Sequence, residues 1–283
     1  MGVTDCHVHI NPVWEMRPDA VRLLGRTDER AARFIKEPKA FLEYLDESGV
    51  ERAVLVNYVA PDVIGYTERA NEFVSEYCRE DPARLVAVGG IRPDHPDPAG
   101  EIARLSGALG IRAIKLHPPH QLFRPNEYAE GGRTSLREVY AACARHHLPV
   151  IVHTGTSVFP RARNKYGDPM LVEDVALDFP DLTIVLAHGG RPLWMETATF
   201  LARRFPNVWL EVSGTPPSKL LQYFPRLAEL APKVLFGTDW PGPGVKDIGQ
   251  NLAAFRALPI PADAQRLILE ENPLKVFPRA PAN

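Results

Sequence analysis

The sequence has few cysteines, no excess of basic residues and no long apolar run, and each shortage excludes a class of protein. Three cysteines in 283 residues, without a C-x-x-C pair, exclude a disulfide framework and favour a reducing, cytoplasmic location. Basic and acidic residues number 33 and 35, so the net charge of −2 predicts no nucleic-acid or anionic-membrane partner. No stretch reaches the ~18 apolar residues that a membrane helix needs.

Several well-known catalytic motifs are missing as well. The chain has no G-x-x-x-x-G-K-[ST] loop, no G-x-G-x-x-G turn after its first strand and no H-E-x-x-H helix. Ser213 stands in Glu-Val-Ser-Gly-Thr, which lacks the first glycine of a nucleophile elbow. Phosphate-loop, dinucleotide-binding and serine-hydrolase chemistry therefore have no support in the sequence.

Eight short runs rich in Val, Ile and Leu alternate with amphipathic stretches. The expected strands are residues 3–9, 52–57, 85–91, 113–117, 150–153, 183–188, 208–212 and 234–238. The expected helices include residues 39–47, 67–80, 134–146, 169–179, 193–205 and 219–230. Continuously apolar strands indicate parallel pairing. We therefore predict one α/β domain over residues 1–283, a (β/α)8 TIM barrel, with an open doubly wound sheet as the alternative.

Two connections are longer than a barrel needs, and both follow the carboxyl end of a strand. Residues 11–36 follow the first strand and residues 118–133 follow the fourth. Barrel enzymes build their sites on this face, so we interpret both segments as lids or pocket walls. Surface insertions without a role are the alternative for either segment.

Histidines gather at the ends of the expected strands. Five of the nine histidines lie there, namely His7, His9, His117, His153 and His188. Asp239 ends the eighth strand in Phe-Gly-Thr-Asp-Trp. In a barrel all these ends meet at one mouth, where histidines and a carboxylate would suit zinc or a similar divalent ion. His95 and His120 stand in proline-rich loops, where contact with a ligand is the less favoured interpretation.

The first strand reads Asp5-Cys6-His7-Val8-His9. Side chains alternate along a strand, which predicts that Asp5, His7 and His9 share one face. Cys6 should then point away from the histidines, so a cysteine nucleophile is not expected.

Positive side chains near the expected mouth favour an anionic substrate. Arg191 follows His188 closely, and an arginine fork suits a carboxylate. The cluster Arg161, Arg163 and Lys165 is equally compatible with a solvated loop.

Lys115 and His117 share a face of the fourth strand. Lys115 could bind a substrate carboxylate, bridge a second metal as a carbamate, or pair with a carboxylate at the rim. Glu211 is either its partner or a residue that orients a ligand histidine.

In this order, these residues resemble the amidohydrolase superfamily and, within it, the amidohydrolase-2 branch of decarboxylases and lactone or ester hydrolases. The resemblance runs from Asp5-Cys6-His7-Val8-His9 through Lys115-Leu116-His117-Pro118 and Ala187-His188-Gly189-Gly190 to Glu271-Asn272-Pro273. It implies that one divalent ion, zinc with manganese as the alternative, binds to His7, His9, His153 and Asp239. It also implies that His188 is a catalytic histidine beside the ion.

We therefore expect a metal-dependent hydrolase of a small carboxylated ester, lactone or amide that uses a metal-activated water. Asp239 would move the proton, and His188 would polarise the carbonyl or hold the water. A non-oxidative decarboxylase with flat walls from Trp14, Phe123, Tyr166 and Trp240 is one alternative. A barrel that binds a metal or small molecule without turnover is another. A homo-oligomer formed through Trp194 or Phe200 is left open.

Overall fold

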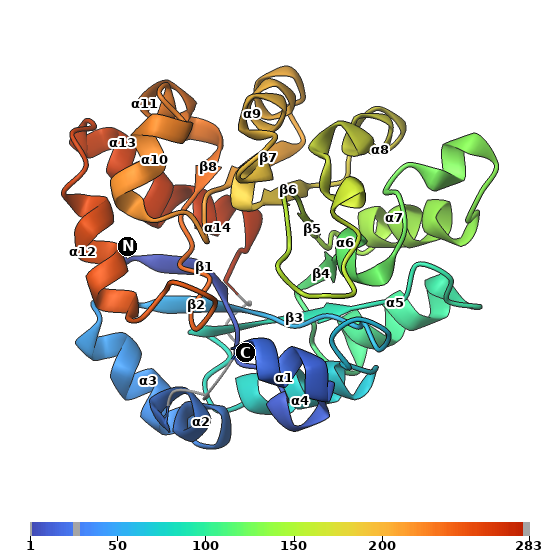
Figure 1. Cartoon of the computed structure of the whole chain (residues 1–283), viewed down its shortest axis with the longest axis horizontal. Helices are drawn as coiled ribbons and strands as arrows, with labels where there is room; N and C mark the ends of the chain where they lie inside the picture. The colour runs from blue at the N-terminus through green and yellow to red at the C-terminus, as the bar shows by residue number, and fades with distance from the viewer. Residues whose placement is uncertain (1, 25–28, 280–283) are drawn as a thin grey trace.

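The computed structural model describes residues 2–24 and 29–279, and its eight parallel strands form one sheet in the order β1 to β8 (Figure 1). The strands are β1 (Thr4–Val8), β2 (Arg52–Val56), β3 (Leu85–Gly90), β4 (Ala113–Leu116), β5 (Val150–His153), β6 (Ile184–Ala187), β7 (Val208–Glu211) and β8 (Val234–Leu235). Helices surround this sheet in Figure 1, as expected for βα units. The predicted (β/α)8 barrel is confirmed.

The α-helices lie outside the sheet and pack on its apolar outer face. Their bounds are α1 (Pro18–Leu24), α2 (Glu29–Lys36), α3 (Pro38–Glu47), α4 (Arg69–Cys78), α5 (Pro98–Gly107), α6 (Pro118–Gln121), α7 (Ser135–Arg145), α8 (Glu173–Asp178), α9 (Met195–Arg204), α10 (Pro217–Tyr223), α11 (Leu227–Leu230), α12 (Ile248–Arg256), α13 (Ala262–Arg266) and α14 (Asn272–Val276). The helix expected over 219–230 is two helices instead, because Pro225 has no backbone N–H and disfavours a helical Phe224.

Shorter turns complete the ring of connections. They are the 3-10 turns Val13–Glu15, Glu127–Glu130, Asn164–Gly167, Pro169–Val172, His188–Gly190 and Ala231–Lys233, and the π-helical turn Leu267–Glu271. The helix expected over 169–179 is accordingly a 3-10 turn followed by α8.

The last strand joins the first through residues beyond its own end. The Cys6 amide donates to the Phe236 carbonyl at 2.9 Å, and the His9 amide donates to the Trp240 carbonyl at 2.7 Å. Between them, the Asp239 amide donates to the His7 carbonyl at 2.8 Å. The barrel seam is therefore the segment that carries the predicted metal ligands from both ends of the chain.

β1 contains a bulge that changes which side chains face inward. Asp5 pairs with Ala53 and Val8 pairs with Leu55, so three residue steps on β1 match two on β2. Asp5 turns to the outer side, where its carboxylate accepts from the Thr238 hydroxyl at 2.7 Å. Cys6 instead packs in the barrel interior with Val54. The predicted alternation was wrong for Asp5 and Cys6, because it assumed a regular strand.

Cys6 nevertheless has no features of a nucleophile. It is buried, and burial raises the pKa of its thiol well above the usual value. Cys6 is therefore unsuited to act as a nucleophile because its thiol is buried and its pKa is raised, whereas the sequence predicted this from the direction of the side chain.

The connection over 11–36 folds into structure that forms part of the core, and its residues 25–28 lie outside the described part of the chain. Phe34 on α2 is buried and stacks on Tyr44 with 4.9 Å between ring centroids. On α1, Asp19 accepts from Arg161 at 2.8 Å, which ties this connection to the loop after β5. The described residues of this connection, 11–24 and 29–36, therefore pack on the barrel near the mouth, the carboxyl end of the sheet, and their role as a pocket wall stays a prediction.

Below the mouth, the barrel interior is apolar and its floor is closed by the C-terminal segment. Val54, Val88, Ile151 and Val185 pack there with Phe277. The Arg52 guanidinium donates two hydrogen bonds of 3.1 Å to the carbonyl of Phe277. This apolar layer thus separates Arg52 at the floor from the polar side chains of the mouth.

The outer helices bear on two predictions, one about a membrane helix and one about an oligomer contact. Within residues 2–24 and 29–279, no helix combines the length and apolar character needed to cross a membrane. Phe200 on α9 is exposed and lies under the Arg204 guanidinium, whereas Trp194 is half-buried. An oligomer formed through these side chains stays a prediction.

Candidate metal centre

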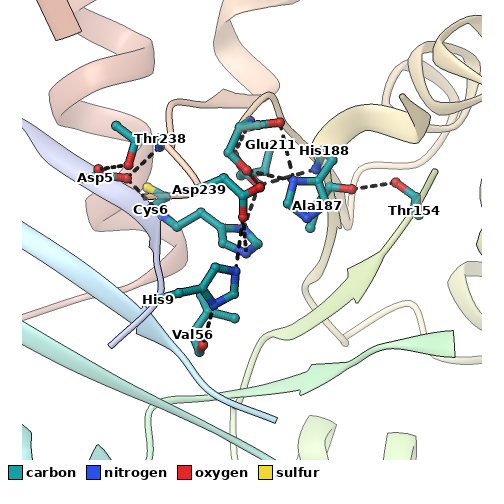
Figure 2. Close-up of polar contacts among 12 residues, drawn as sticks. Asp5, Cys6, His9, Val56, Thr154, Ala187, His188, Glu211, Thr238 and Asp239 are labelled. Atoms are coloured by element: carbon teal, nitrogen blue, oxygen red, sulfur yellow. Dashed lines mark hydrogen bonds and ion pairs between the residues drawn. The ribbon is translucent and has the colours of Figure 1, made fainter. Parts of the chain in front are cut away.

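Three of the predicted ligands, His7, His9 and Asp239, meet at the barrel seam. Figure 2 shows His9 and Asp239 directed toward each other. The Asp239 Oδ1 atom lies 3.1 Å from His9 Nε2 and 3.8 Å from His7 Nε2. Each residue offers one ligand atom, and these atoms lie within 4.8 Å of one another. Two imidazole nitrogens and a carboxylate oxygen converging in this way suit a divalent cation.

Among the predicted ligands, two buried imidazole nitrogens have no hydrogen-bond partner in the described chain. They are His7 Nε2 and His153 Nε2. Leaving a buried polar atom unsatisfied costs about 1–3 kcal/mol, so a native structure normally provides a partner. A metal ion is a partner that an imidazole lone pair can bind directly. The residues present therefore fit the ion that the sequence predicts.

His153 reaches the centre from the opposite side of the mouth. Its ring centroid lies 4.7 Å from that of His188, which in turn lies 4.7 Å from that of His7. His153 is not part of the compact group formed by His7, His9 and Asp239 in the described chain. The four predicted ligands thus surround one region, with His153 the most distant.

The second nitrogen of His7 and of His9 is held by an oxygen from another strand. His7 Nδ1 lies 2.9 Å from Glu211 Oε2 on β7, and His9 Nδ1 lies 3.0 Å from the Val56 carbonyl on β2. Because both oxygens accept, each Nδ1 carries the proton and each Nε2 keeps a lone pair. β2, which neighbours β1, and β7, which lies beyond β8, therefore leave both histidines able to bind an ion through Nε2.

Glu211, for which the sequence left two roles open, contacts a predicted ligand histidine, His7. Besides His7, its Oε2 accepts from the Ser213 hydroxyl at 2.8 Å, and burial raises the pKa of its carboxyl group. Glu211→Gln replaces an acceptor of the His7 proton with an amide, so we expect the zinc dissociation constant to rise about 10- to 100-fold. Chelator competition measures this change, and Glu101→Gln on α5 is the matched control. An unchanged dissociation constant would contradict an orienting role for Glu211.

Ser213 also fixes the predicted catalytic histidine. Its Oγ lies 2.9 Å from His188 Nδ1 and donates its own proton to Glu211. Ser213 therefore accepts from His188, whose Nδ1 carries the proton and whose Nε2 keeps a lone pair. Burial, reinforced by Arg191, lowers the pKa of His188 well below its usual value, so the ring is neutral.

Asp239 is shared between the histidines and Arg191. Its Oδ2 lies 3.3 Å from Arg191 Nη2, while its Oδ1 contacts His9. Burial pushes the pKa of Asp239 upward, but the neighbouring His9 and His7 side chains and the charge of Arg191 outweigh it and hold the pKa well below its usual range. The carboxylate is therefore ionised.

The backbone is strained at both predicted catalytic residues. His188 has φ of 65° and Asp239 has φ of 69°, which lie in the left-handed region that side chains with a Cβ rarely adopt. Such strain is typical of active sites, where the surrounding structure enforces it. Here the turns after β6 and β8 direct both side chains toward the mouth.

Lys115 and His117 also lie at the centre. Lys115 is 1% exposed, and its Nζ has no hydrogen-bond partner in the described chain. Burial lowers the pKa of Lys115, against the opposing effect of Glu211. The alternative of a rim lysine paired with a carboxylate is wrong, because this amine is buried and has no such hydrogen bond. His117 stacks on His153 with 3.8 Å between ring centroids.

The other positive cluster is a solvated loop. Arg161, Arg163 and Lys165 are exposed. Arg161 pairs with Asp19, and the Lys165 ammonium lies 5.1 Å from the ring centroid of Tyr166. Arg191 is therefore the arginine at the centre, and the cluster belongs to the outer surface.

Two of the four aromatic residues expected as walls for a ring-shaped substrate lie in the core instead. Trp240 is fully buried and packs against Phe34 and Phe41, and Phe123 is buried in the same core. Trp14 is 60% exposed and packs edge-on against Phe73 of α4, and Tyr166 is half-buried. Burial of apolar area against α2 and α3 determines where Trp240 lies, whereas Trp14 and Tyr166 stay predictions.

The chain matches one protein family and resembles several solved structures. The family model described as amidohydrolase matches residues 4–279. No curated protein is detectably similar to the chain in sequence. Among solved structures, a TIM-barrel protein of uncharacterised function from Bordetella bronchiseptica is 25% identical, with 98% of each chain covered and a TM-score of 0.76.

Two decarboxylases share the fold at lower identity. The 2,6-dihydroxybenzoate decarboxylase from Rhizobium is 19% identical, with 98% of each chain covered and a TM-score of 0.68. The 5-carboxyvanillate decarboxylase from Novosphingobium aromaticivorans, solved with bound manganese, is 17% identical, with 97% of this chain and 96% of that chain covered and a TM-score of 0.66.

Proposed function

Because the chain belongs to the amidohydrolase-2 family and buries three ligand side chains together at its barrel mouth, we propose that it is a metal-dependent hydrolase. The substrate class is a small ester, lactone or amide that carries a carboxylate. The observation that supports the proposal most directly is the convergence of His7, His9 and Asp239 beside the unpartnered Nε2 of His153.

One divalent ion would be held by the Nε2 atoms of His7, His9 and His153 and by the Asp239 carboxylate. When bound, such an ion polarises a carbonyl and lowers the pKa of water from 15.7 toward ~7. Nitrogen and carboxylate donors in this proportion suit zinc, with manganese as the alternative.

Asp239 is the proposed proton carrier. Its carboxylate is ionised and buried at the centre, so it can accept a proton from the attacking water and deliver it to the leaving group. Arg191 holds the Oδ2 side of this carboxylate at 3.3 Å and thereby limits its rotation.

His188 is proposed to hold the attacking water. Since its Nδ1 proton is directed to Ser213, its Nε2 can only accept a hydrogen bond. An accepting nitrogen orients the hydrogen of a water, whereas polarising a carbonyl would need a donor. Of the two roles considered for His188, the contact with Ser213 favours holding the water over polarising the carbonyl.

Arg191 and Lys115 are the proposed partners of the substrate carboxylate. Arg191 Nε is buried without a partner, and so is Lys115 Nζ. Gly214, with φ of 65°, lies against the Arg191 guanidinium so closely that any Cβ would overlap it. The guanidinium is therefore packed in one position at the mouth.

Arg191→Ala should raise KM for a carboxylated substrate about 10- to 100-fold, because a hydrogen bond to a charged group contributes about 1.5–3 kcal/mol. The methyl ester of the same carboxylate lacks the charge, so its KM should not change. Arg161→Ala removes an exposed arginine and serves as the control. Equal losses for the acid and its methyl ester would show that Arg191 does not recognise the carboxylate.

The test begins with metal analysis of protein purified without chelator or histidine tag. About one equivalent of metal, with hydrolysis of carboxylated lactones or esters, is the expected result. Carbon dioxide release from aromatic or muconate-type acids would instead make the protein a decarboxylase. Bound metal without turnover of either set would favour a binding barrel, and a chain that takes up no metal would overturn the proposal.

A further inference from the structure

Three imidazole rings form a stack that runs from the metal centre toward the rim of the barrel. The rings of His153 and His117 have centroids 3.8 Å apart and planes 14° apart. The rings of His117 and His120 have centroids 3.6 Å apart and planes 12° apart. The stack joins a predicted ligand on β5 to a histidine on α6 that had no favoured role in the sequence.

The outermost ring is fixed at both of its nitrogens. His120 Nδ1 lies 3.0 Å from the Tyr58 hydroxyl, and His120 Nε2 lies 2.7 Å from the Ser157 hydroxyl. Tyr58 follows β2 and is buried, whereas Ser157 follows β5 and is half-buried. The plane of the His120 ring is therefore set by two different loops of the mouth.

His153 differs from the other predicted ligand and catalytic histidines in how its ring is oriented. His7, His9 and His188 each have Nδ1 held by an oxygen, from Glu211, Val56 and Ser213 respectively. In the part of the chain that the structure describes, no hydrogen bond holds either ring nitrogen of His153. Contact with neighbouring rings is what remains to orient it, and His117 is the ring in parallel contact.

The Ser157–His120–Tyr58 chain has the order of a nucleophile, a base and an orienting group, but it lacks a strong base. Burial lowers the pKa of His120 to about 3, so its ring accepts a proton poorly. A positioning role needs only the ring and its two hydrogen bonds, both of which are present.

We propose that Tyr58, His120 and Ser157 are positioning residues that orient His153 for metal binding through the stacked ring of His117. The proposal rests on the proposed function, because it takes His153 as a ligand. The physical reason is that rings in face-to-face contact, with centroids 3.6 and 3.8 Å apart, cannot tilt out of plane without a steric clash with the neighbouring ring. Fixing the outer ring at two nitrogens limits the rotation of the inner two, so Nε2 of His153 points to the same place before and after the ion binds.

The test is the zinc dissociation constant, measured by chelator competition on the full chain. His120→Ala should weaken zinc binding about 10- to 100-fold, the range found when groups that orient ligands are removed. His120→Phe keeps a flat ring without the two hydrogen bonds and should fall between His120→Ala and the wild type. The double variant Tyr58→Phe/Ser157→Ala, which keeps the whole stack, should resemble His120→Phe.

Ser106→Ala is the matched control, because Ser106 also contacts a histidine, His146, at 3.2 Å but on the outer helices α5 and α7. Its zinc dissociation constant should equal that of the wild type. Cobalt replaces zinc in a second measurement, in which the visible spectrum reports ligand geometry. The spectrum should change in the His120 variants and stay unchanged in Ser106→Ala, whereas a loss of stability alone would leave it unaltered.

The outcomes separate this inference from the proposed function. A wild-type chain that binds zinc, with an unchanged dissociation constant and cobalt spectrum in the double variant and in His120→Phe, would overturn the positioning role and leave the metal centre intact. A wild-type chain that binds no zinc would overturn the proposed function and this inference together. If His120→Ala does not fold, the zinc dissociation constants of His120→Phe and of Tyr58→Phe/Ser157→Ala test the proposal.

Discussion

Asp239→Asn is expected to lower kcat about 10²- to 10⁴-fold on the substrate found by the hydrolysis screen. This is the range that a positioned acid–base group contributes. The amide keeps the shape of the side chain, but it cannot accept the proton of the attacking water or return it to the leaving group. Single-turnover kinetics at saturating zinc measure the loss in the chemical step.

Zinc must be present in that experiment, since Asp239 also offers an oxygen to the ion. Metal content is therefore measured on the same samples. Asp178→Asn removes one negative charge from α8, where Asp178 accepts from Tyr128, and should leave kcat unchanged. Turnover equal to the wild type in an Asp239→Asn sample with its metal bound would show that Asp239 does not carry the proton.

Replacing both β1 histidines, His7→Ala with His9→Ala, is expected to abolish metal binding. The bound metal should fall from about one equivalent to near none, because two of the four donors are lost. A ligand at about 1,000 times its dissociation constant stabilises a protein by about 4 kcal/mol, so zinc should raise the unfolding temperature of the wild type but not of this variant. Elemental analysis and thermal unfolding with added zinc give the two readouts.

A matched variant, His95→Ala with His146→Ala, removes two imidazoles far from the mouth and should keep the full metal content. Two equivalents in the wild type, with one retained after loss of His7 and His9, would instead place a second ion at the centre. Lys115 would then have to be reconsidered as a bridging carbamate.

Much of the fold could be predicted because the barrel repeats one simple pattern. Apolar runs such as those of β5 and β6 are buried on both faces, so their composition alone indicates parallel strands. The bulge in β1 could not be predicted in this way. An extra residue between Asp5 and Val8 leaves the sequence pattern of the strand almost unchanged, although it moves Cys6 to the barrel interior.

Some residues of the candidate site could likewise be predicted from the sequence, and others could not. His7, His9 and Asp239 carry a local signal, since each lies next to a strand end whose direction the fold determines. Ser213 could have been found as well, because it stands two residues after Glu211, and the two side chains are hydrogen-bonded. Its hydroxyl was weighed only as a nucleophile.

The stack of His153, His117 and His120 has no comparable signal. Its rings come from β5, the residue after β4 and α6, and the hydroxyl groups that fix it come from two further loops. Positions of this kind depend on how loops pack over the mouth, which alternation and motif spacing do not describe. The same reason explains why Trp240 and Phe123 were expected at the mouth rather than in the core.

The seam of the barrel has a consequence for how the protein is made. Asp239 and the β1 histidines are separated by 230 residues or more, and backbone hydrogen bonds of 2.7–2.9 Å bring them together. On the ribosome, His7 and His9 emerge first, while their carboxylate partner is still untranslated. The complete set of metal donors can form only after nearly the whole chain has been synthesised and its last strand has docked beside its first. If the proposed ion binds, its loading is therefore expected late in biogenesis, and a prematurely terminated chain would lack the full set of proposed donors.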